Sequence, residues 1–123
     1  MNSPTGQLGE DYAASLLVQK GYQIVERNYH SRFGEIDIIA QNSKYIVFAE
    51  VKTRDENYQV SPLEAVTPGK QKKLYKTALL YLQSHPTGLQ PRFDVIGITT
   101  AGGSFAVKSA EHIENAFFGG GYY

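Results

Sequence analysis

The chain has 123 residues and a hydrophobic content of 41%, which suits one compact domain with its own core. Twelve lysines and arginines balance twelve acidic residues, so net charge gives no general argument for a polyanionic partner. The absence of cysteine excludes disulfides and thiolate metal sites. No apolar run approaches the ~18 residues of a membrane span and the start does not resemble a signal peptide, so we expect a cytoplasmic protein that does not enter the membrane.

Helix and strand signals divide the first half of the chain into one helix and three strands. Ser3 and Pro4 provide an N-cap and a first helical proline, and Gly21 suits the position after the helix, so we expect a helix over residues 4–20. Strand-forming residues then predict strands over 22–29, 34–41 and 44–54. With Asn42 and Ser43 as the turn between the last two, these strands form an antiparallel meander.

The second half adds one more helix and the end of the sheet. Thr67 and Pro68 repeat the cap-then-proline signal and predict a helix that ends near Pro86. A strand follows over residues 92–100, and a glycine-rich turn leads to a short strand over 105–108. We therefore expect a single α/β domain over residues 1–116. Residues 117–123, rich in glycine and aromatics, are predicted to be a mobile terminus or a contact arm whose aromatics a partner buries.

Charged side chains interrupt a face of the predicted sheet that otherwise carries large apolar groups. Because side chains alternate, the strand over 34–41 presents Glu35, Asp37 and Ile39 on one face and Ile36, Ile38 and Ala40 on the other. A two-residue turn pairs Asp37 with Phe48, whereas a slip of two residues places Asp37 opposite Glu50. In both registers Asp37, Glu50 and Lys52 share one face, with diagonal neighbours about 7–8 Å apart.

Like charges on a half-buried sheet repel, so the carboxylates need a cation or a lysine as compensation. Oxygen ligands favour Mg²⁺ or Mn²⁺ over zinc. The three histidines show no ligand spacing and are expected to be structural or surface residues: His30, His85 and His112. The competing interpretation is that the charges form the solvated face of an antiparallel pair. Against it, Ile39 and Phe48 lie on the same face as the charges.

These strands also resemble a known motif. Residues 34–40 (GEIDIIA) and 48–54 (FAEVKTR) resemble the PD-(D/E)xK nuclease signature, an Asp on one strand and Glu-x-Lys on the next, although no proline precedes Asp37. With Gly9-Glu10 in the first helix and Lys70-Gln71 at the start of the second, the chain is similar almost end to end to the YraN-like family of uncharacterised bacterial proteins. That family is a distant relative of archaeal Holliday-junction resolvases.

The resemblance implies a restriction endonuclease-like αβββαβ core, with a mixed central sheet flanked by helices. It implies a Mg²⁺- or Mn²⁺-dependent endonuclease that hydrolyses phosphodiester bonds in DNA, including branched or recombination and repair intermediates. Asp37 and Glu50 would hold the metal, with the Val51 carbonyl as a further ligand, and Lys52 would act on the attacking water. Glu10 corresponds to the helix-borne acid that completes such a site. Because resolvases cut two strands, a homodimer is also implied.

Several polar residues near this site are open to two interpretations. Gln71 falls on the apolar arc of its helix and needs a buried partner, either the site water or substrate, or a backbone carbonyl. With Glu35 it forms a predicted secondary site. A group of cations could contact phosphates or form a solvated surface: Lys70, Lys72, Lys73, Lys76, Arg32 and Arg54.

Two other classes of function compete with the nuclease. A nucleic-acid-binding or accessory module would keep the fold and the acidic cluster without cleaving. A purely structural or protein-interaction domain would have to explain the crowded carboxylates without a metal. The sequence disfavours the accessory module modestly, because the full set of acids and the lysine is present.

Overall fold

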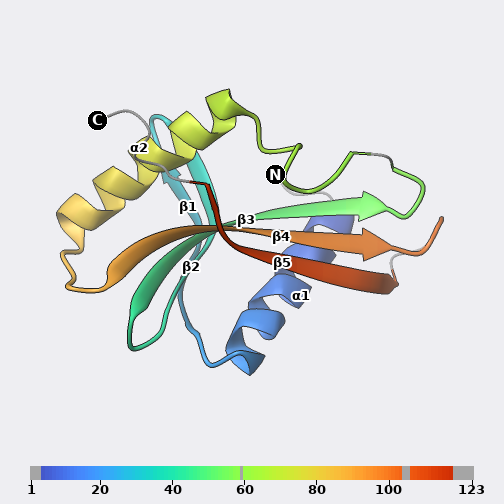
Figure 1. Cartoon of the computed structure of the whole chain (residues 1–123), viewed down its shortest axis with the longest axis horizontal. Coiled ribbons are helices and arrows are strands. Elements are labelled where there is room, and N and C mark those ends of the chain that lie inside the picture. The colour runs from blue at the N-terminus through green and yellow to red at the C-terminus, as the bar shows by residue number, and fades with distance from the viewer. Residues whose placement is uncertain (1–3, 59, 104–105, 118–123) are drawn as a thin grey trace.

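A five-stranded sheet lies between two helices in the computed structural model, which describes residues 4–58, 60–103 and 106–117 (Figure 1). In chain order the elements are α1 (Pro4–Gln19), β1 (Gln23–Ser31), β2 (Gly34–Gln41), β3 (Tyr45–Asp55), α2 (Pro68–Ser84), β4 (Gln90–Thr100) and β5 (Val107–Phe117). This is the expected α/β class, compatible with a restriction endonuclease-like core. Among the described residues, no helix is long and apolar enough to cross a membrane.

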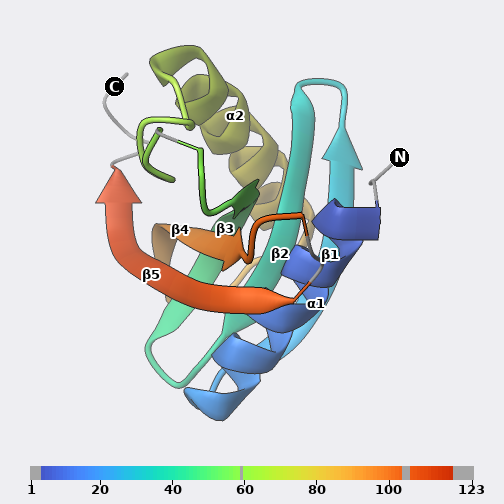
Figure 2. The ribbon, with the colours of Figure 1, turned by 90° about the vertical axis from the view of Figure 1, so that its right-hand side faces the viewer.

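The sheet is mixed, with the strands in chain order from β1 to β5. β3 and β4 are parallel, and the other neighbours are antiparallel. A parallel pair needs a crossover, which α2 supplies on one face of the sheet. α1 covers the opposite face, so the sheet is buried on both sides (Figure 2).

Each helix covers its own apolar cluster. The α2 side holds Ile36, Ile39, Ile46, Phe48, Val66, Leu74, Ala78, Tyr81, Phe93, Val95 and Phe117. The α1 side holds Ala13, Leu17, Tyr22, Ile38, Ala40, Val47, Ala49, Ile96 and Ile98. Along β3 the residues alternate between the two clusters, as a strand buried on both faces requires. This alternation puts Glu50 and Lys52 on the α2 side, in line with Phe48.

β2 does not keep a strict alternation. Ile38 and Ala40 belong to the α1 cluster, but Ile36 belongs to the α2 cluster, so the expectation that these three share a face was wrong for Ile36. The register places Asn28 of β1 opposite Asp37, and Asn28 has a left-handed φ of 54°. Asparagine tolerates this conformation better than most residues, so the loss of strict alternation on β2 lies opposite an irregular residue of β1.

The β2–β3 register is the slipped one of the two considered. Gln41 pairs with Ile46 and Ile38 with Ala49, and continuing this register puts Asp37 opposite Glu50. The turn lies one residue later than predicted, because the Asn42 N–H donates to the Tyr45 carbonyl and the Asn42 side chain accepts hydrogen bonds from the backbone N–H groups of Lys44 and Tyr45. The turn chemistry therefore sets which side chains meet at the acidic cluster.

β2 and β3 part after the Ile38–Ala49 pair, although both strands continue. β2 extends back to Gly34 beside β1, and β3 runs on to Asp55 beside β4. Figure 1 shows β3, β4 and β5 leading away together while β1 and β2 lead up behind α2. We call this opening the fork. Asp37 and Glu50 are the first residues beyond the last pair, one on each arm.

The helix starts were predicted well, because both carry local signals. Thr67 caps α2 through its side-chain oxygen, which accepts the Lys70 N–H, and Pro68 follows as the first helical residue. α2 ends at Ser84 and α1 at Gln19, within two residues of the expected positions. Pro4 begins α1 as expected, whereas the predicted N-cap Ser3 lies outside the described residues.

The last strand was mispredicted. β5 covers Val107–Phe117 and pairs with β4 along most of its length, whereas the sequence predicted only a short strand over 105–108. Most of β5 is polar and exposed, so hydrophobic patterning does not reveal it. Phe117, assigned to the tail, is the buried end of β5 and stacks on Phe93. The rest of the predicted tail, 118–123, lies outside the described residues.

Candidate functional site

Two carboxylates meet at the fork. Asp37 is only 8% exposed, and Glu50 on the opposite arm lies within hydrogen-bonding contact of it. The Val51 N–H donates to Asp37 Oδ2 at 2.8 Å, so a carboxylate takes the place that a strand carbonyl would otherwise occupy. Lys52 Nζ lies 3.3 Å from Glu50 Oε2. The structure therefore brings together the predicted trio of Asp37, Glu50 and Lys52.

The electrostatics of this pair are unfavourable for two ionised acids. Burial raises the pKa of Asp37, and the hydrogen bond and negative charge of Glu50 raise it further, to about 8. The Val51 N–H opposes the shift without cancelling it. At neutral pH the pair therefore holds a proton, unless a cation takes its place.

Lys52 links the acidic pair to a second lysine. Contact with the Lys52 ammonium lowers the pKa of Lys70, which lies in the first turn of α2. The two cations are thus held close together on the α2 side of the sheet, and Glu50 is in ion-pair contact with Lys52. Two crowded cations beside an acidic pair are an arrangement that a phosphate group would stabilise.

Glu10 is buried on α1, where its Oε1 lies 3.7 Å from Arg27 Nη2. The preceding residue, Gly9, lies where α1 packs closely on β3. A Cβ at this position would collide with the Thr53 hydroxyl. Glu10 therefore approaches the same stretch of β3 as the acidic pair, from the other face. Within residues 4–58, 60–103 and 106–117 no three acidic or histidine side chains gather as a metal-binding group, so the role of Glu10 as a ligand stays a prediction.

The predicted secondary residues take structural partners. Gln71 Nε2 donates to the Val66 carbonyl at 3.0 Å, which is the second of its two predicted alternatives. Glu35 is exposed and pairs with His30 at 3.2 Å, although its charge still contributes weakly to raising the pKa of Asp37. The partners of Gln71 and Glu35 are therefore the Val66 carbonyl and His30, and not Asp37 or Glu50.

A groove extends from Lys52 along the end of β3. It has a volume of about 470 Å³ and is lined by Lys52, Thr53, Arg54, Asp55, Tyr58, Ala65 and Lys70. Of the predicted nucleic-acid contacts, the structure places Lys70 and Arg54 here, and Lys52 belongs to both the groove and the acidic pair. We call this feature the cationic groove.

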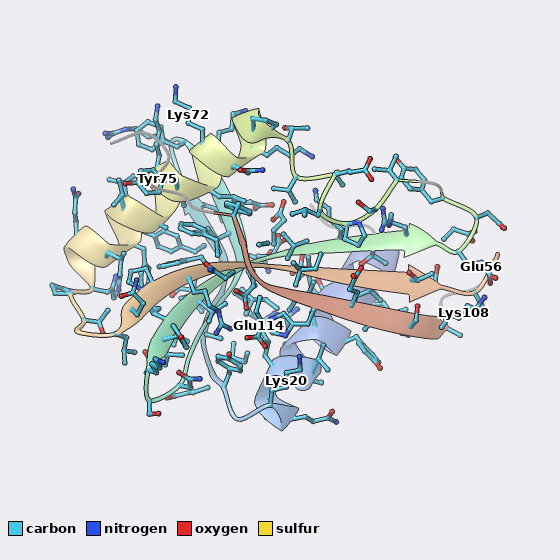
Figure 3. All side chains as sticks on the ribbon, viewed as in Figure 1. Lys20, Glu56, Lys72, Tyr75, Lys108 and Glu114 are labelled. Atoms are coloured by element: carbon cyan, nitrogen blue, oxygen red, sulfur yellow. The ribbon has the colours of Figure 1, made fainter. Side chains whose placement is uncertain are left out.

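The other predicted cations lie elsewhere. Lys76 Nζ and the Arg32 guanidinium both lie over the Phe33 ring, at 5.2 and 4.9 Å from its centroid, at the tip of the β1–β2 hairpin. Lys73 packs near Gly34 of the same hairpin, and Lys72 points away from the sheet (Figure 3). The lysines of α2 therefore do not form one continuous surface.

A second polar cluster escaped the sequence analysis. Asp94 on β4 is fully buried and accepts hydrogen bonds from Arg92 Nε and Nη2, from His112 Nε2 and from the Asn115 N–H. Arg92 also donates to the Tyr22 hydroxyl at 2.6 Å. The available signal was Arg-x-Asp in an apolar strand, but its partners lie on strands whose pairing was not predicted. His112 is thereby confirmed as a structural histidine.

The fold and the acidic pair define an α/β protein with one buried and one half-buried carboxylate and two lysines at the fork of a mixed sheet. The chain belongs to the uncharacterised protein family UPF0102, whose family model matches residues 9–98. This range contains every residue of the acidic pair and its lysines. The family assignment agrees with the resemblance to the YraN-like proteins.

Relatives cover nearly the whole chain. A UPF0102 protein of Syntrophomonas wolfei is 46% identical over 118 residues, which span 95% of this chain and 100% of the relative. UPF0102 proteins of Chlorobium phaeobacteroides and Clostridium botulinum are 45% and 44% identical, over 91% and 94% of this chain and 92% and 95% of their own lengths. The alignments therefore cover nearly all of this chain and nearly all of these family members.

Proposed function

We propose that this protein is a metal-dependent nuclease that hydrolyses phosphodiester bonds in DNA, with Asp37, Glu50 and Lys52 at its centre. The observation that carries the proposal is a buried carboxylate, Asp37, in contact across the fork with the half-buried carboxylate of Glu50, which has a lysine 3.3 Å away. Such a pair costs stability on its own, because burial and mutual repulsion both disfavour its charged form. Unfavourable titrating groups of this kind cluster at functional sites.

The donor set fits a hard divalent cation. Asp37 and Glu50 offer oxygen ligands only, and the described chain offers no histidine at this position. A cation would replace the proton that the pair otherwise holds. The Val51 carbonyl and Glu10 are the further ligands that the nuclease resemblance implies. Bound Mg²⁺ or Mn²⁺ supplies Lewis-acid polarisation of the phosphate and a lowered pKa of a water molecule.

The chain's own residues have separate roles in this proposal. Asp37 and Glu50 provide the negative charge that anchors the site, and the Val51 N–H fixes the Asp37 carboxylate. Lys52, held against Glu50, is placed to orient the attacking water and to offset charge that develops on the phosphate oxygens.

The family resemblance favours branched recombination and repair intermediates as substrates. A homodimer would cut both strands of such a substrate, and we expect the protein to act in the cytoplasm. The groove with Lys52, Arg54 and Lys70 supports a polyanionic substrate even though the net charge is zero, because local charge is what a phosphate encounters. An accessory protein that binds nucleic acid without cutting would use the same groove.

The test is to incubate the purified protein with duplex, single-stranded, flap and four-way-junction DNA, and with RNA, in Mg²⁺ or Mn²⁺. Parallel reactions contain EDTA or the variants Asp37→Asn, Glu50→Gln and Lys52→Ala. We expect cleavage that requires the metal and falls at least about 100-fold in each variant, a loss typical of removing one electrostatic contributor. Calorimetry should detect metal binding to the wild type and not to Asp37→Asn.

Lys44→Ala is the matched control, because Lys44 is exposed at the opposite end of β3. It should cleave at the wild-type rate. Cleavage that persists in Glu50→Gln would place the active centre elsewhere. Binding of DNA without cleavage in either metal would favour the accessory protein.

A further inference from the structure

The cationic groove contains an aromatic side chain as well as cations. Tyr58 lines it and is 60% exposed, although large aromatic rings are usually more buried than this. The Arg54 guanidinium lies 5.6 Å from the centroid of the Tyr58 ring. One face of the groove therefore combines a cation and a ring next to the Lys52 and Lys70 pair.

The backbone holds Tyr58 in a defined position. Its N–H donates to the Asp55 carbonyl at 3.0 Å, and the Asp55 carboxylate accepts from the N–H groups of Asn57 and Gly103. Glu56 extends the attachment, because it pairs with Lys108 at 2.8 Å and accepts from the Gly102 N–H (Figure 3). The turn that carries Tyr58 is thus hydrogen-bonded to the β4–β5 connection, so the backbone at the exposed ring is fixed in position.

The charge in the groove is incompletely balanced by the protein. Asp55, the acid that lines the groove, directs its oxygens to backbone N–H groups. Within the described part of the chain, Arg54 and Lys70 have no ion-pair partner. Lys70 Nζ donates to the Ala65 carbonyl at 3.5 Å, and Arg54 Nη1 is buried without a hydrogen bond. A ligand that supplies acceptor oxygens would satisfy these donors, and phosphate oxygens are such acceptors.

We propose that the cationic groove binds an unpaired strand of nucleic acid, with its phosphates on Lys52, Lys70 and Arg54 and one base stacked on Tyr58. This proposal rests on the nuclease function, and it names the substrate class: DNA in which single-stranded nucleotides adjoin the phosphate at the acidic pair. Lys52 and Arg54 are two residues apart on β3, about 7 Å along the strand, so a backbone that leaves the acidic pair meets Arg54 next.

The ring is what favours an unpaired strand over a continuous duplex. In a duplex the bases are stacked on one another and the backbone faces the protein, so an aromatic among phosphate-binding cations has no base to contact. In a single strand every base has a face free for stacking, and proteins that bind such strands combine a cationic groove with aromatic rings. Arg54 adds a cation beside the same stack.

The experiment compares binding of a labelled single strand of about ten nucleotides with binding of the matching duplex, by fluorescence anisotropy in EDTA so that no cleavage occurs. Tyr58→Ala should weaken binding of the single strand by about 5- to 150-fold, which corresponds to the loss of one base–aromatic stack. Duplex binding should be unchanged, and Tyr58→Phe should retain wild-type affinity because it keeps the ring.

A 2-aminopurine base in the single strand gives a second readout. Its fluorescence should be quenched by the wild type and by Tyr58→Phe, but not by Tyr58→Ala. The matched control is Tyr12→Ala, because Tyr12 is another exposed tyrosine and lies on α1, on the opposite face of the sheet. It should bind as the wild type does.

Three results overturn the inference: no binding of the single strand, equal binding by Tyr58→Ala and the wild type, or an equal loss for duplex and single strand. The nuclease proposal is tested separately. If Tyr58-dependent binding is found but no DNA is cleaved in Mg²⁺ or Mn²⁺, the nuclease proposal fails and the groove remains a single-strand site. If Tyr58→Ala cleaves and binds as the wild type does, the groove inference fails and the nuclease proposal stands.

Discussion

Asp37 and Asp94 are both buried aspartates on central strands, yet their surroundings drive them to opposite protonation states. Burial alone would raise the pKa of Asp94, but hydrogen bonds from His112, Arg92 and the Asn115 N–H outweigh it and hold the pKa below its usual range. Asp37 has one backbone donor and a second carboxylate as its neighbour, so its pKa rises to about 8. One aspartate supports the fold, whereas the other costs stability at a position suited to chemistry.

The opposite pKa shifts of Asp94 and Asp37 follow from the neighbours that each aspartate meets at an irregular point of the sheet. Asp94 sits where β4 and β5 change register, and Asn115, with a left-handed φ of 51°, turns its N–H toward the carboxylate. Figure 2 shows β5 bending near its C-terminal end. Asp37 sits where β2 and β3 part, and the group it meets there is another acid. At the β4–β5 irregularity Asp94 receives several hydrogen-bond donors, whereas at the fork Asp37 receives the Val51 N–H and faces the Glu50 carboxylate.

The largest expected effect is on Asp94. Asp94→Ala leaves the buried Arg92 without its closest carboxylate partner and with the exposed Glu114 at 3.5 Å, and removing one member of a buried ion pair costs about 3–5 kcal/mol. Urea unfolding should show this loss of stability. Asp94→Asn, which keeps the shape and one acceptor oxygen, should lose less and serves if the alanine variant does not fold. A loss below about 1 kcal/mol in both would mean that the cluster around Asp94 contributes no more than an exposed ion pair.

The next effect tests the opposite behaviour of Asp37. Mg²⁺ or Mn²⁺ at 100 times its dissociation constant should stabilise the wild type by about 2.7 kcal/mol, since the cation binds only the folded pair. Asp37→Asn should show no such rise in melting temperature. Asp94→Asn should keep the rise, because its carboxylate lies outside the acidic pair. An equal rise in wild type and Asp37→Asn would exclude the pair as the metal site.

The pH dependence of stability should separate the two aspartates by sign. Folding raises the pKa of Asp37 from 3.8 to about 8, so its contribution is fully present below about pH 4 and is lost as pH rises toward 8. Without divalent cations this slope should reach up to about 1.4 kcal/mol per pH unit, and Asp37→Asn should remove it. Denaturant unfolding over pH 5–8 measures the difference; parallel curves for the two proteins would contradict it.

Asp94 should act in the reverse direction. Its folded pKa is depressed, so its contribution is present above the unfolded pKa of about 3.9 and is lost as pH falls through the folded value. Acid unfolding of the wild type should therefore depend on Asp94 and not on Asp37. Asp94→Asn should be the variant with the weaker dependence below pH 5.

The smallest effect is expected at an exposed ion pair. Lys108 and Glu56 lie 2.8 Å apart near the ends of β5 and β3, where water and salt screen them. Lys108→Ala should leave the urea midpoint unchanged within error. A clear loss would show that this pair holds the turn of Tyr58 in place, and that variant should then also bind single-stranded DNA more weakly.

The sequence predicted the trio at the fork because its information is local. Alternation along two adjacent strands places Asp37, Glu50 and Lys52 together in either register, so an error in the turn at Asn42 did not matter. Helix starts were equally accessible, since Thr67 and Pro68 act within one turn. The fold class followed from the order of these elements.

The parts that were missed depend on partners far apart in the sequence. Asp94 and His112 are 18 residues apart on strands of which the second is largely polar, so neither the strand nor the contact was visible. The change of face at Ile36 lies beside the irregular backbone of Asn28 on another strand, which no local pattern in β2 reveals. Tyr58 gave no signal, because a lone tyrosine after a strand acquires meaning only when Arg54 and Lys70 are seen beside it.

The position of the fork has a consequence for how the protein tolerates change. The acidic pair is carried by two strands inside the sheet and not by their connecting turns, so its geometry is set by strand pairing on both outer sides, β1 with β2 and β3 with β4. Changes in the turn at 101–103 would alter the rim of the molecule without moving the two carboxylates, whereas a change at 42–44 would shift the β2–β3 register that brings them together. Sequence drift in one turn and strict demands in the other can therefore coexist in one small chain.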